Sequence, residues 1–431
     1  MLVSGWGRYP KINANVFNPS SVEECKELIS KYKIIPRGMG RSYGDSANYK
    51  NIIQTTYFDH YIDFDFVNGY LTCEAGTKII DILDIIVKKG WFLPVTPGSS
   101  QITIGGAIAS DVHGKNHHLS GTFSKYVKEI SLLTGLGDIL EISENKNKLI
   151  FHATCGGMGL TGLILKAKIK LLKIKSNYII QKTIKTTCLE EVCEKFEEYS
   201  NHEYSVAWLD CLSKGKFLGK SVLMLGKHAD DQFNEKSKKI SLNIPVNAPS
   251  QILNKFTIKS FNKIYYAMAK HNEIKHVDLQ SYFYPLDSIQ NWNRLYGQNG
   301  FVQYQFVIPK SNGIKNLKKI LLDISENTNG SFLAVLKKFG NINRNLLTFP
   351  TLGYTLSLDF KISKNIFIFL KNLDENIADY GGRIYLSKDA LMNEDIFKKT
   401  YPRWIEFEEL RHKIGASGKF SSTQSERLGL S

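Results

Sequence analysis

The 431-residue sequence lacks several features that would assign it to a familiar class of protein. It has no apolar run of the roughly 18 residues that a membrane-spanning helix needs. Its first residues, MLVSGWGRYPKINANVF, lack the basic and then apolar layout of a signal peptide, so we expect a cytoplasmic protein. It contains no internal repeat and no low-complexity tract. We therefore expect a globular chain with one large domain or two ordinary ones.

Cysteine is scarce, and its spacing excludes common metal and redox motifs. The six cysteines include no CxxC pair, which argues against a structural zinc site and against a thioredoxin-like site. We therefore expect free thiols, as in most cytosolic proteins.

Acidic residues are outnumbered, with 41 Asp and Glu against 56 Lys and Arg, which gives a formal charge of +15. Such a balance favours anionic partners: nucleic acid, an acidic membrane surface or a phosphorylated substrate. No RNP-like motif, zinc finger or helix-turn-helix pattern is present, so we expect no nucleic-acid partner. The abundance of Lys, Asn and Ile also fits an AT-biased genome, in which many lysines are simply solvated surface residues.

The most informative segment is residues 96–118, TPGSSQITIGGAIASDVHGKNHH. A Pro97-Gly98 turn is followed by Gly105-Gly106 and a series of small residues. Glycine lets a backbone approach a phosphate or a flat ring closely, because no Cβ intervenes. A dense group of His and Lys ends the segment. The pattern predicts a large anionic cofactor that lies on the backbone, with reactive groups at one edge.

Two further glycine-rich loops invite comparison with phosphate-binding motifs. Residues 38–45, GMGRSYGD, can form a nest of backbone N–H groups between Arg37 and Arg41. Residues 157–162, GMGLTG, match GxGxxG literally. The Rossmann fingerprint requires a helix after the glycines, whereas here a strand of alternating Lys and apolar residues follows. We therefore expect this loop to touch a cofactor other than a nicotinamide dinucleotide.

The group formed by His113, Lys115, His117 and His118 has three interpretations: metal ligands, catalytic groups or surface polar residues. A metal site would need a regular spacing and nearby carboxylates, but only Asp111 is close and the preceding glycines make a regular helix doubtful. We expect no metal. A place beside a redox cofactor fits better, because imidazole and ammonium groups stabilise developing negative charge.

Periodicity predicts a mixture of helices and strands. We expect helices over 19–32, capped by Ser20 or Ser21, and over 78–90, ending at Gly90. Strands are expected at 34–35, within 52–77, over 163–175 and at 301–309.

Beyond about residue 176 glycine motifs become sparse and aromatic residues frequent. The lysine-rich stretch 214–239 is expected to be a mobile basic segment, either a solvated loop or a contact for anionic headgroups. The aromatic residues of 280–306 suit either a core or, with Gln303 and Gln305, a pocket for a sugar. Lys337 and Lys388 are either snorkelling structural lysines or functional ones.

Three motifs together carry a family resemblance: PRGMGRSYGDSA, PGSSQITIGGAIASDVHGKNHH and CGGMGLTGLI. They resemble the vanillyl-alcohol-oxidase-type (PCMH-type) FAD enzymes, and within these the decaprenylphosphoryl-β-D-ribose 2′-oxidase family. The likeness runs from GWGR to YPR and is weakest over about 180–275. It implies a two-domain α+β fold: an FAD-binding domain over 1–176, a substrate domain over 177–382 built on an antiparallel sheet, and a C-terminal segment, 383–431, that returns to the FAD domain.

The resemblance implies an oxidoreductase with non-covalent FAD that oxidises the 2′-hydroxyl of polyprenylphosphoryl-β-D-ribose to a ketone. An NAD(P)H-dependent keto-reductase would then complete the epimerisation to the arabinose donor for cell-wall synthesis, at the inner face of the membrane. A second possibility is an aldonolactone or alditol oxidase of the same superfamily, which acts on a free sugar. A third is a non-catalytic protein that binds anionic lipid.

Motif positions also imply individual roles. The catalytic candidates are Lys388, His113 and Tyr43. The expected FAD-binding residues are Arg37, Gly38, Met39, Gly40, Arg41, Ser42, Tyr43, Gly98, Ser99, Thr103, Gly105, Gly106, Ile108, Asp111, His113, Lys115, Gly159 and Tyr385. The expected substrate-binding residues are Gln303, Gln305, Lys337, Ser357, Lys388 and Phe283. Ser357 and Phe283 depart from the family pattern, which has cysteine and tyrosine at the corresponding places.

Overall fold

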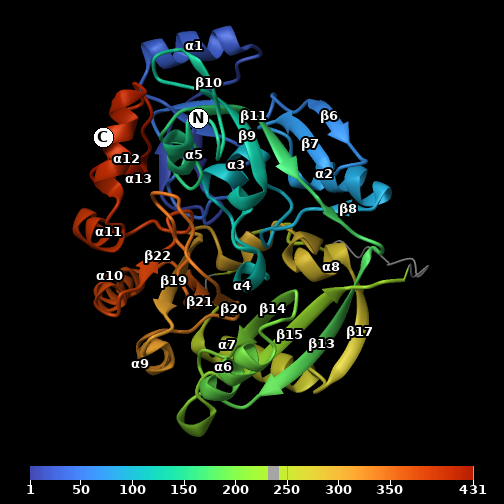
Figure 1. Ribbon diagram of the computed structural model, residues 1–431. Helices are drawn as coiled ribbons and strands as arrows, with labels where there is room; N and C mark the ends of the chain where they lie inside the picture. The colour runs from blue at the N-terminus through green and yellow to red at the C-terminus, as the bar shows by residue number, and fades with distance from the viewer. Residues whose placement is uncertain (232–241, 250, 431) are drawn as a thin grey trace.

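The computed structural model describes residues 1–231, 242–249 and 251–430. The N-terminal sheets lie in the upper part of Figure 1 and a large antiparallel sheet lies below them. The last helices of the chain lie along the side of the upper part, next to N-terminal elements. The predicted α+β class is confirmed.

The N-terminal part contains four small sheets. A five-stranded antiparallel sheet has the order β10-β9-β11-β7-β6. Its strands are β6 (Tyr61–Asp65), β7 (Tyr70–Glu74), β9 (Val127–Leu133), β10 (Ile139–Ile142) and β11 (Leu163–Lys170). A parallel sheet joins β3 (Asn15–Phe17), β5 (Asn51–Gln54) and β4 (Ile35–Arg37). Two-stranded sheets join β1 (Leu2–Ser4) to β2 (Lys11–Asn13), and β8 (Trp91–Phe92) to β12 (Leu172–Lys173).

The large sheet has eight strands in the order β17-β13-β15-β14-β20-β21-β19-β22. They are β13 (Tyr178–Thr186), β14 (Tyr204–Leu209), β15 (Ser221–His228), β17 (Glu273–Asp278), β19 (Phe301–Pro309), β20 (Ala334–Phe339), β21 (Gly353–Lys361) and β22 (Arg383–Ile384). A short parallel pair, β16 (Leu242–Asn243) and β18 (Ile289–Gln290), lies outside it. The large sheet thus spans residues 178–384, the part of the chain where glycine motifs are sparse and aromatic residues frequent. The domain boundaries remain a prediction.

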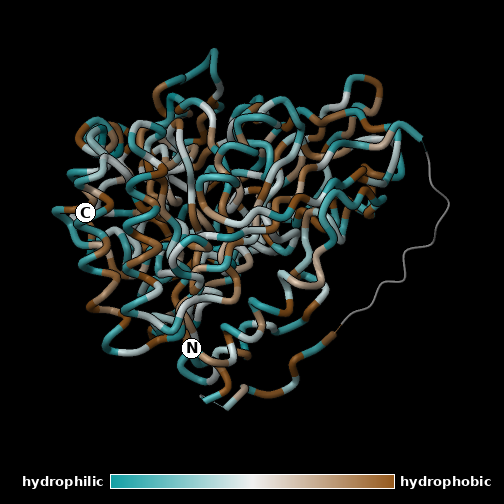
Figure 2. Tube along the Cα trace, turned by 90° about the horizontal axis from the view of Figure 1, so that it is seen from below, coloured by the Kyte–Doolittle hydropathy of each residue, from teal (hydrophilic) through white to brown (hydrophobic). Residues whose placement is uncertain are grey.

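Helices cover these sheets and alternate between hydrophobic and hydrophilic residues along their turns, as Figure 2 shows. The α-helices are α1 (Val22–Lys31), α2 (Ile79–Ile86), α3 (Ile104–Ala109), α4 (His117–Ser120), α5 (Lys148–Thr154), α6 (Leu189–Glu198), α7 (Lys255–Met268), α8 (Leu279–Phe283), α9 (Gly313–Asn327), α10 (Lys364–Asp379), α11 (Glu394–Thr400), α12 (Trp404–Lys413) and α13 (Thr423–Arg427). Short 3-10 helices span Val87–Lys89, Phe123–Tyr126, Gly215–Phe217, Pro285–Ser288 and Trp292–Tyr296.

Most of the local expectations agree with the structure. Helix α1 begins after Ser21, whose hydroxyl accepts a hydrogen bond from the Glu24 N–H. Helix α2 and the following 3-10 turn end at Gly90, which has φ 76°. Strand β11 follows the GMGLTG loop directly, so the Rossmann interpretation is excluded there. On β19 the side chains of Val302, Tyr304 and Phe306 belong to the main hydrophobic core.

One local expectation is wrong. Residues 214–239 are not one mobile segment, because β15 (Ser221–His228) is a largely buried inner strand of the large sheet. The Lys220 ammonium lies 3.4 Å from the Asp210 carboxylate, while Lys236, Lys238 and Lys239 lie outside the described residues. Gly105 and Gly106 lie in the short helix α3, whose N-terminus the Thr103 hydroxyl caps by accepting from the Gly106 N–H, and no helix runs through His113 and Lys115.

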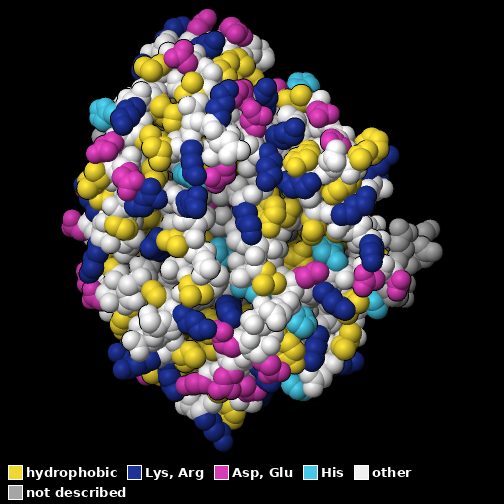
Figure 3. Space-filling view, in the orientation of Figure 1, with side chains coloured by type: hydrophobic (Ala, Val, Ile, Leu, Met, Phe, Trp, Pro, Cys, Tyr) yellow, Lys and Arg dark blue, Asp and Glu magenta, His cyan; other side chains and the backbone are white. Residues whose placement is uncertain are grey.

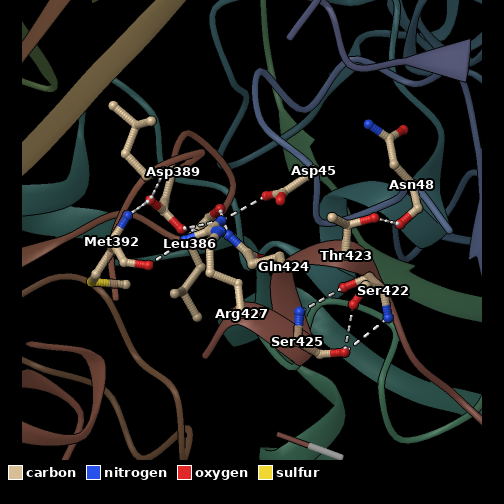
Figure 4. Close-up of polar contacts among 11 residues, drawn as sticks. Asp45, Asn48, Leu386, Asp389, Met392, Ser422, Thr423, Gln424, Ser425 and Arg427 are labelled. Atoms are coloured by element: carbon tan, nitrogen blue, oxygen red, sulfur yellow. Dashed lines mark hydrogen bonds and ion pairs between the residues drawn. The ribbon is translucent and has the colours of Figure 1, made fainter. Parts of the chain in front are cut away.

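Hydrogen bonds and ion pairs tie the C-terminal segment to residues 43–48, at the end of the first glycine-rich loop, GMGRSYGD (Figure 4). Arg427 on α13 lies 2.7 Å from the Asp45 carboxylate and 3.0 Å from that of Asp389. The Gln424 side chain donates to the Leu386 carbonyl, and the Thr423 hydroxyl donates to the Asn48 carbonyl. These contacts hold residues 386–389 beside residues 43–48, although about 340 positions separate them in the sequence.

All six cysteines are free. Across residues 1–231, 242–249 and 251–430, no helix combines the length and apolarity needed to cross a bilayer.

Candidate functional site

One large cavity lies between the glycine-rich loops and strands β19, β20 and β21 of the large sheet. Its volume is about 1030 Å³, at the upper end of the range for sites that enclose small molecules. All but two of the predicted site residues line it. They are Arg37, Gly38, Met39, Gly40, Arg41, Ser42, Tyr43, Gly98, Ser99, Thr103, Gly105, Gly106, His113, Lys115, Gly159, Phe283, Gln303, Gln305, Lys337, Ser357, Tyr385 and Lys388.

The first glycine-rich loop, residues 38–43, follows β4 and presents its backbone to the cavity. Within the described residues, none of the backbone N–H groups from Gly38 to Ser42 has a protein hydrogen-bond partner. Gly40 has φ 60°, a conformation that glycine adopts at little cost. The loop therefore offers free donors to an anion, as a backbone nest does.

The position of Arg37 beside the loop suggests that its guanidinium faces the bound anion, but the guanidinium binds protein groups instead. Its guanidinium donates to the Asn48 side chain at 2.5 Å, to the Ser4 carbonyl at 2.7 Å and to the Ala47 carbonyl at 3.1 Å. A Cβ at Gly40 would lie 2.2 Å from the same guanidinium. Arg37 thus braces the loop from behind, and the positive charge at this end comes from Arg41, which stacks 3.9 Å from the Trp6 ring.

The second glycine-rich loop of the cavity, residues 97–106, is fixed in place by Asp287, a residue that the sequence did not single out. Asp287 accepts hydrogen bonds from the Ser99 hydroxyl at 2.7 Å, and from the Ser100 N–H and hydroxyl at 2.7 and 2.8 Å. A Cβ added at Gly98 would meet nothing within 4 Å. The Gly98 backbone therefore borders open cavity space, where a bulky ligand can lie against it.

These features fit FAD. Free backbone donors and Arg41 suit its pyrophosphate, and the uncrowded surface at Gly98 suits close contact with a flat ring. The residues that would hold it are the two glycine-rich loops, with Thr103, Gly106 and Gly159 along the same wall.

Three partly buried lysines line a further part of the cavity, here called the lysine end. Lys388 follows β22, Lys337 lies on β20, and Lys115 lies in the loop before α4. Burial lowers the pKa of Lys388 and of Lys115 to about 7, and that of Lys337 to about 8, because the charged form loses hydration. Each of these lysines therefore exchanges its proton near neutral pH.

Lys388 is placed over an aromatic ring. Its ammonium lies 3.6 Å from the centre of the Tyr43 ring, and the Tyr43 N–H donates to the Ser387 carbonyl. Two of the three predicted catalytic side chains are thus in direct contact, although one lies in the first glycine-rich loop and the other near the C-terminus. A cation over a ring face is attracted by the ring quadrupole.

His113 lies in the cavity wall as a neutral imidazole. Its Nε2 lies 3.1 Å from the Gln305 amide nitrogen, and its ring packs 4.8 Å from Phe339. Burial, with the charges of Lys337, His117 and Lys388, holds its pKa well below the usual value. Its Nδ1 is buried without a partner in the described chain. His113 can therefore offer a neutral hydrogen bond but no positive charge.

Asp359, which the sequence did not suggest, lies behind the lysine end of the cavity. It faces Gln303 in the β19–β21 register, and the Gln303 amide donates to its carboxylate at 2.6 Å. The Tyr296 hydroxyl donates to the other oxygen at 3.3 Å. Burial raises the pKa of Asp359 to about 7, and its charge raises the pKa of Lys388. No sequence signal marks this residue beyond its position on a cavity-lining strand.

Four residues of the glycine-histidine segment lie apart from the cavity. Ile108 belongs to the hydrophobic core. The Asp111 carboxylate accepts from the side-chain amides of Asn343 and Asn345, and so joins two loops. His117 accepts from the Gly340 N–H at 3.1 Å, and His118 Nε2 lies 2.9 Å from the His202 carbonyl. Across the described residues, no three His, Cys, Asp or Glu side chains are grouped to hold a metal ion.

Another part of the cavity wall, here called the apolar end, is aromatic and apolar, and through Trp6 it borders Arg41. This apolar end is lined by Trp6, Val206, Trp208, Met224, Phe261, Tyr265, Leu286, Ile289, Trp292, Leu295, Phe332 and Leu333. The aromatic density of 280–306 indicated part of this wall, and Phe283 lies there as expected. Trp208 and the α7 residues Phe261 and Tyr265 come from the stretch where the sequence is least distinctive.

Comparison with known proteins decides the family. Residues 14–143 match the FAD binding domain model. The chain is 34% identical to the decaprenylphosphoryl-beta-D-ribose oxidase of Mycolicibacterium smegmatis, over 99% of this chain and 97% of that protein. The chain belongs to the decaprenylphosphoryl-β-D-ribose oxidase family. As a member of this family it is an FAD-dependent oxidoreductase.

More distant relatives resemble only part of this oxidase-family chain. The L-gulonolactone oxidase of Bos taurus is 28% identical over 42% of the chain and 42% of its own length. Cytokinin dehydrogenase 2 of Arabidopsis thaliana is 28% identical over 36% of the chain and 33% of its own length. Both are far weaker matches than the full-length one.

Proposed function

We propose that the protein oxidises the 2′-hydroxyl of polyprenylphosphoryl-β-D-ribose to a 2′-ketone, with non-covalently bound FAD. The observation that carries this proposal is the continuity of one cavity. It combines free backbone donors, three partly buried lysines and an apolar aromatic wall. A cofactor pyrophosphate, a phosphorylated pentose and an isoprenoid chain need these three environments. The mycobacterial relative, similar over its full length, is named for this substrate class.

The chain's own residues bind and orient the reactants. FAD, when bound, supplies the acceptor for the hydride from C2′ of the sugar. Lys388 orients the 2′-hydroxyl and stabilises negative charge that develops beside it, and its pKa of about 7 lets it exchange the hydroxyl proton at neutral pH. The Tyr43 ring contacts the Lys388 ammonium and holds it in place. The catalytic residues in this proposal are therefore Lys388, Tyr43 and the neutral His113.

The substrate-binding residues divide by chemistry. Gln303 and Gln305 present amides to the ribose hydroxyls, and Lys337 supplies positive charge for the phosphate. Lys115 donates to the Tyr282 carbonyl and lies 4.1 Å from the Tyr282 ring, so it bounds the cofactor side of the cavity. Ser357 pairs with Gln305 across the sheet and lines the cavity between these groups.

The chemistry also requires partners. A 2′-ketone becomes the arabinose epimer only after hydride is returned from the opposite face, so a separate NAD(P)H-dependent keto-reductase must follow. A polyprenyl phosphate resides in a bilayer, so the protein works at the membrane surface, on the cytoplasmic side. On the face of the protein shown in Figure 3, Lys and Arg side chains are dispersed among Asp and Glu and form no single basic patch.

The test is anaerobic mixing of the purified protein with a short-chain polyprenylphosphoryl-β-D-ribose while the visible flavin absorption is recorded. Bleaching by this compound, but not by free ribose, alditols or aldonolactones, is the expected result. Bleaching by a free polyol or a lactone would instead identify a free-sugar oxidase. A purified protein without flavin would point to a lipid-binding protein.

A further inference from the structure

Helix α7 (Lys255–Met268) has an unusual outward surface. Phe256, Ile264 and Met268 are 79%, 59% and 77% exposed. Ile264 and Met268 are four positions apart and therefore lie on the same side of the helix. Single exposed apolar residues are common, but a group on one helix indicates an interaction surface.

The exposure does not come from a poorly seated helix. Asn254 and Thr257 form a capping box at its start. The buried Asn262 side chain donates to the Asp210 carboxylate at 2.7 Å, and the Tyr266 hydroxyl donates to the Thr186 carbonyl at 3.2 Å. The opposite side of α7 is thus fixed to the large sheet, and the apolar residues stay outside.

Positive charge accompanies these apolar residues. The sequence from 242 to 272 contains no Asp or Glu but has Lys255, Lys259, Lys263 and Lys270. Lys259 and Lys263 are exposed and make no ion pair with any residue that the structure describes. Lysines beside exposed Phe, Ile and Met are typical of helices that lie in the interface of an anionic membrane.

The same helix forms part of the cavity wall. Phe261 and Tyr265 line the apolar end, where Tyr265 packs 4.6 Å from Trp208 and Phe261 packs 5.6 Å from Phe332. Phe261 and Tyr265 are themselves 43% and 37% exposed and lie on the same stripe of the helix as Ile264 and Met268. The exposed apolar stripe of α7 is therefore continuous with the cavity wall.

We propose that α7 docks the protein on an anionic lipid bilayer, with Phe256, Ile264 and Met268 inserted among the acyl chains and Lys259 and Lys263 at the headgroups. The purpose of this docking rests on the proposed function, because it brings the apolar end of the cavity to the bilayer that holds an isoprenoid substrate. The docking itself depends only on the surface of α7.

Binding of the purified, FAD-loaded protein to vesicles tests the proposal without any turnover. Vesicles of phosphatidylglycerol mixed with phosphatidylcholine are expected to sediment the protein, and pure phosphatidylcholine much less. The double variant Ile264→Ser/Met268→Ser should bind the anionic vesicles at least tenfold more weakly. The variant Lys259→Gln/Lys263→Gln should lose several-fold in affinity per lysine at low salt, and this loss should shrink at high salt.

Matched controls remove exposed apolar residues elsewhere. Ile368 on α10 and Ile405 on α12 are each 53% exposed, so Ile368→Ser/Ile405→Ser changes surface hydrophobicity without touching α7. This variant should bind vesicles like the unmodified chain. Equal binding by the α7 variants, or equal loss in the control, would overturn the proposal. So would a dimer in light scattering that Ile264→Ser/Met268→Ser converts to monomer, because a second copy would then cover α7.

Flavin reduction separates this inference from the proposed function. The α7 variants should bleach with a soluble short-chain substrate as the unmodified protein does, and should slow only with a long-chain substrate held in vesicles. If no variant bleaches with the soluble substrate, the proposed function fails while the vesicle result still decides the docking.

Discussion

The two ends of the cavity are built in different ways. The glycine-rich end is made of backbone from two short sequence segments, residues 38–43 and 98–106, and its donors are N–H groups. The lysine end is made of side chains from β19, β20, β21, the loop before α4 and the C-terminal segment. A backbone site is a local property of the chain, whereas a side-chain site needs the whole tertiary structure to assemble it.

The largest effect is expected from the lysine end. Replacing Lys388 with Ala should lower the rate of flavin reduction by at least about 100-fold, because one preorganised charge beside the reacting atoms is lost. The FAD content should not change. Rapid-mixing absorbance measures the rate, with Lys371→Ala on the exposed side of α10 as control. A rate within a few-fold of the unmodified protein would remove Lys388 from the mechanism.

Substitutions at the glycine-rich end should act on the cofactor or on the fold, according to what the new side chain meets. Gly98→Val adds atoms in open cavity space, so it should weaken FAD binding by about tenfold or more with little change in the unfolding of the apoprotein.

The matched comparison is Gly44→Ala. A Cβ at Gly44 would lie 1.7 Å from the Asp389 carbonyl oxygen, so this variant should lose about 1–3 kcal/mol of unfolding free energy. Flavin content after gel filtration and thermal unfolding of the apoproteins separate the two effects. If Gly98→Val destabilises the apoprotein as much as Gly44→Ala does, Gly98 does not border open cavity space.

A smaller effect should appear in the pH dependence. The Asp359 charge raises the pKa of Lys388, so Asp359→Asn should lower that pKa, by about one unit. Lys388 then loses its proton at lower pH, and the pH limb of flavin reduction that it controls should move to lower pH. The pH profile of the reduction rate measures this shift. Tyr296→Phe removes a hydroxyl from the same carboxylate but no charge, so it should shift the limb less.

The smallest effect is expected at Ser357, where the family pattern has cysteine. Ser357 lines the cavity on β21, and a thiol is close in size to a hydroxyl. Ser357→Cys should therefore keep the rate of flavin reduction within about threefold. A loss of tenfold or more would show that the hydroxyl makes a specific hydrogen bond to the substrate.

The sequence predicted the fold class, the FAD cofactor and the family, and these are confirmed. It also placed nearly all of the cavity-lining candidates, because glycine loops and the motif segments are contiguous in the chain. Of the predicted cofactor residues, Ile108 packs in the core and Asp111 binds Asn343 and Asn345, so neither lines the cavity. The sequence missed Asp287, Asp359 and the aromatic residues of α7.

By itself, the sequence determined where the backbone is free of side chains, because glycine spacing acts locally and needs no distant partner. Tertiary structure alone decided the charges. Burial lowers the pKa of Lys115, Lys337 and Lys388, and Asp359 offsets part of this effect at Lys388. Such shifts depend on the water and the charges that the fold removes or brings near. The fold brings residues 386–389 beside residues 43–48, where direct contacts and the ties through α13 hold them.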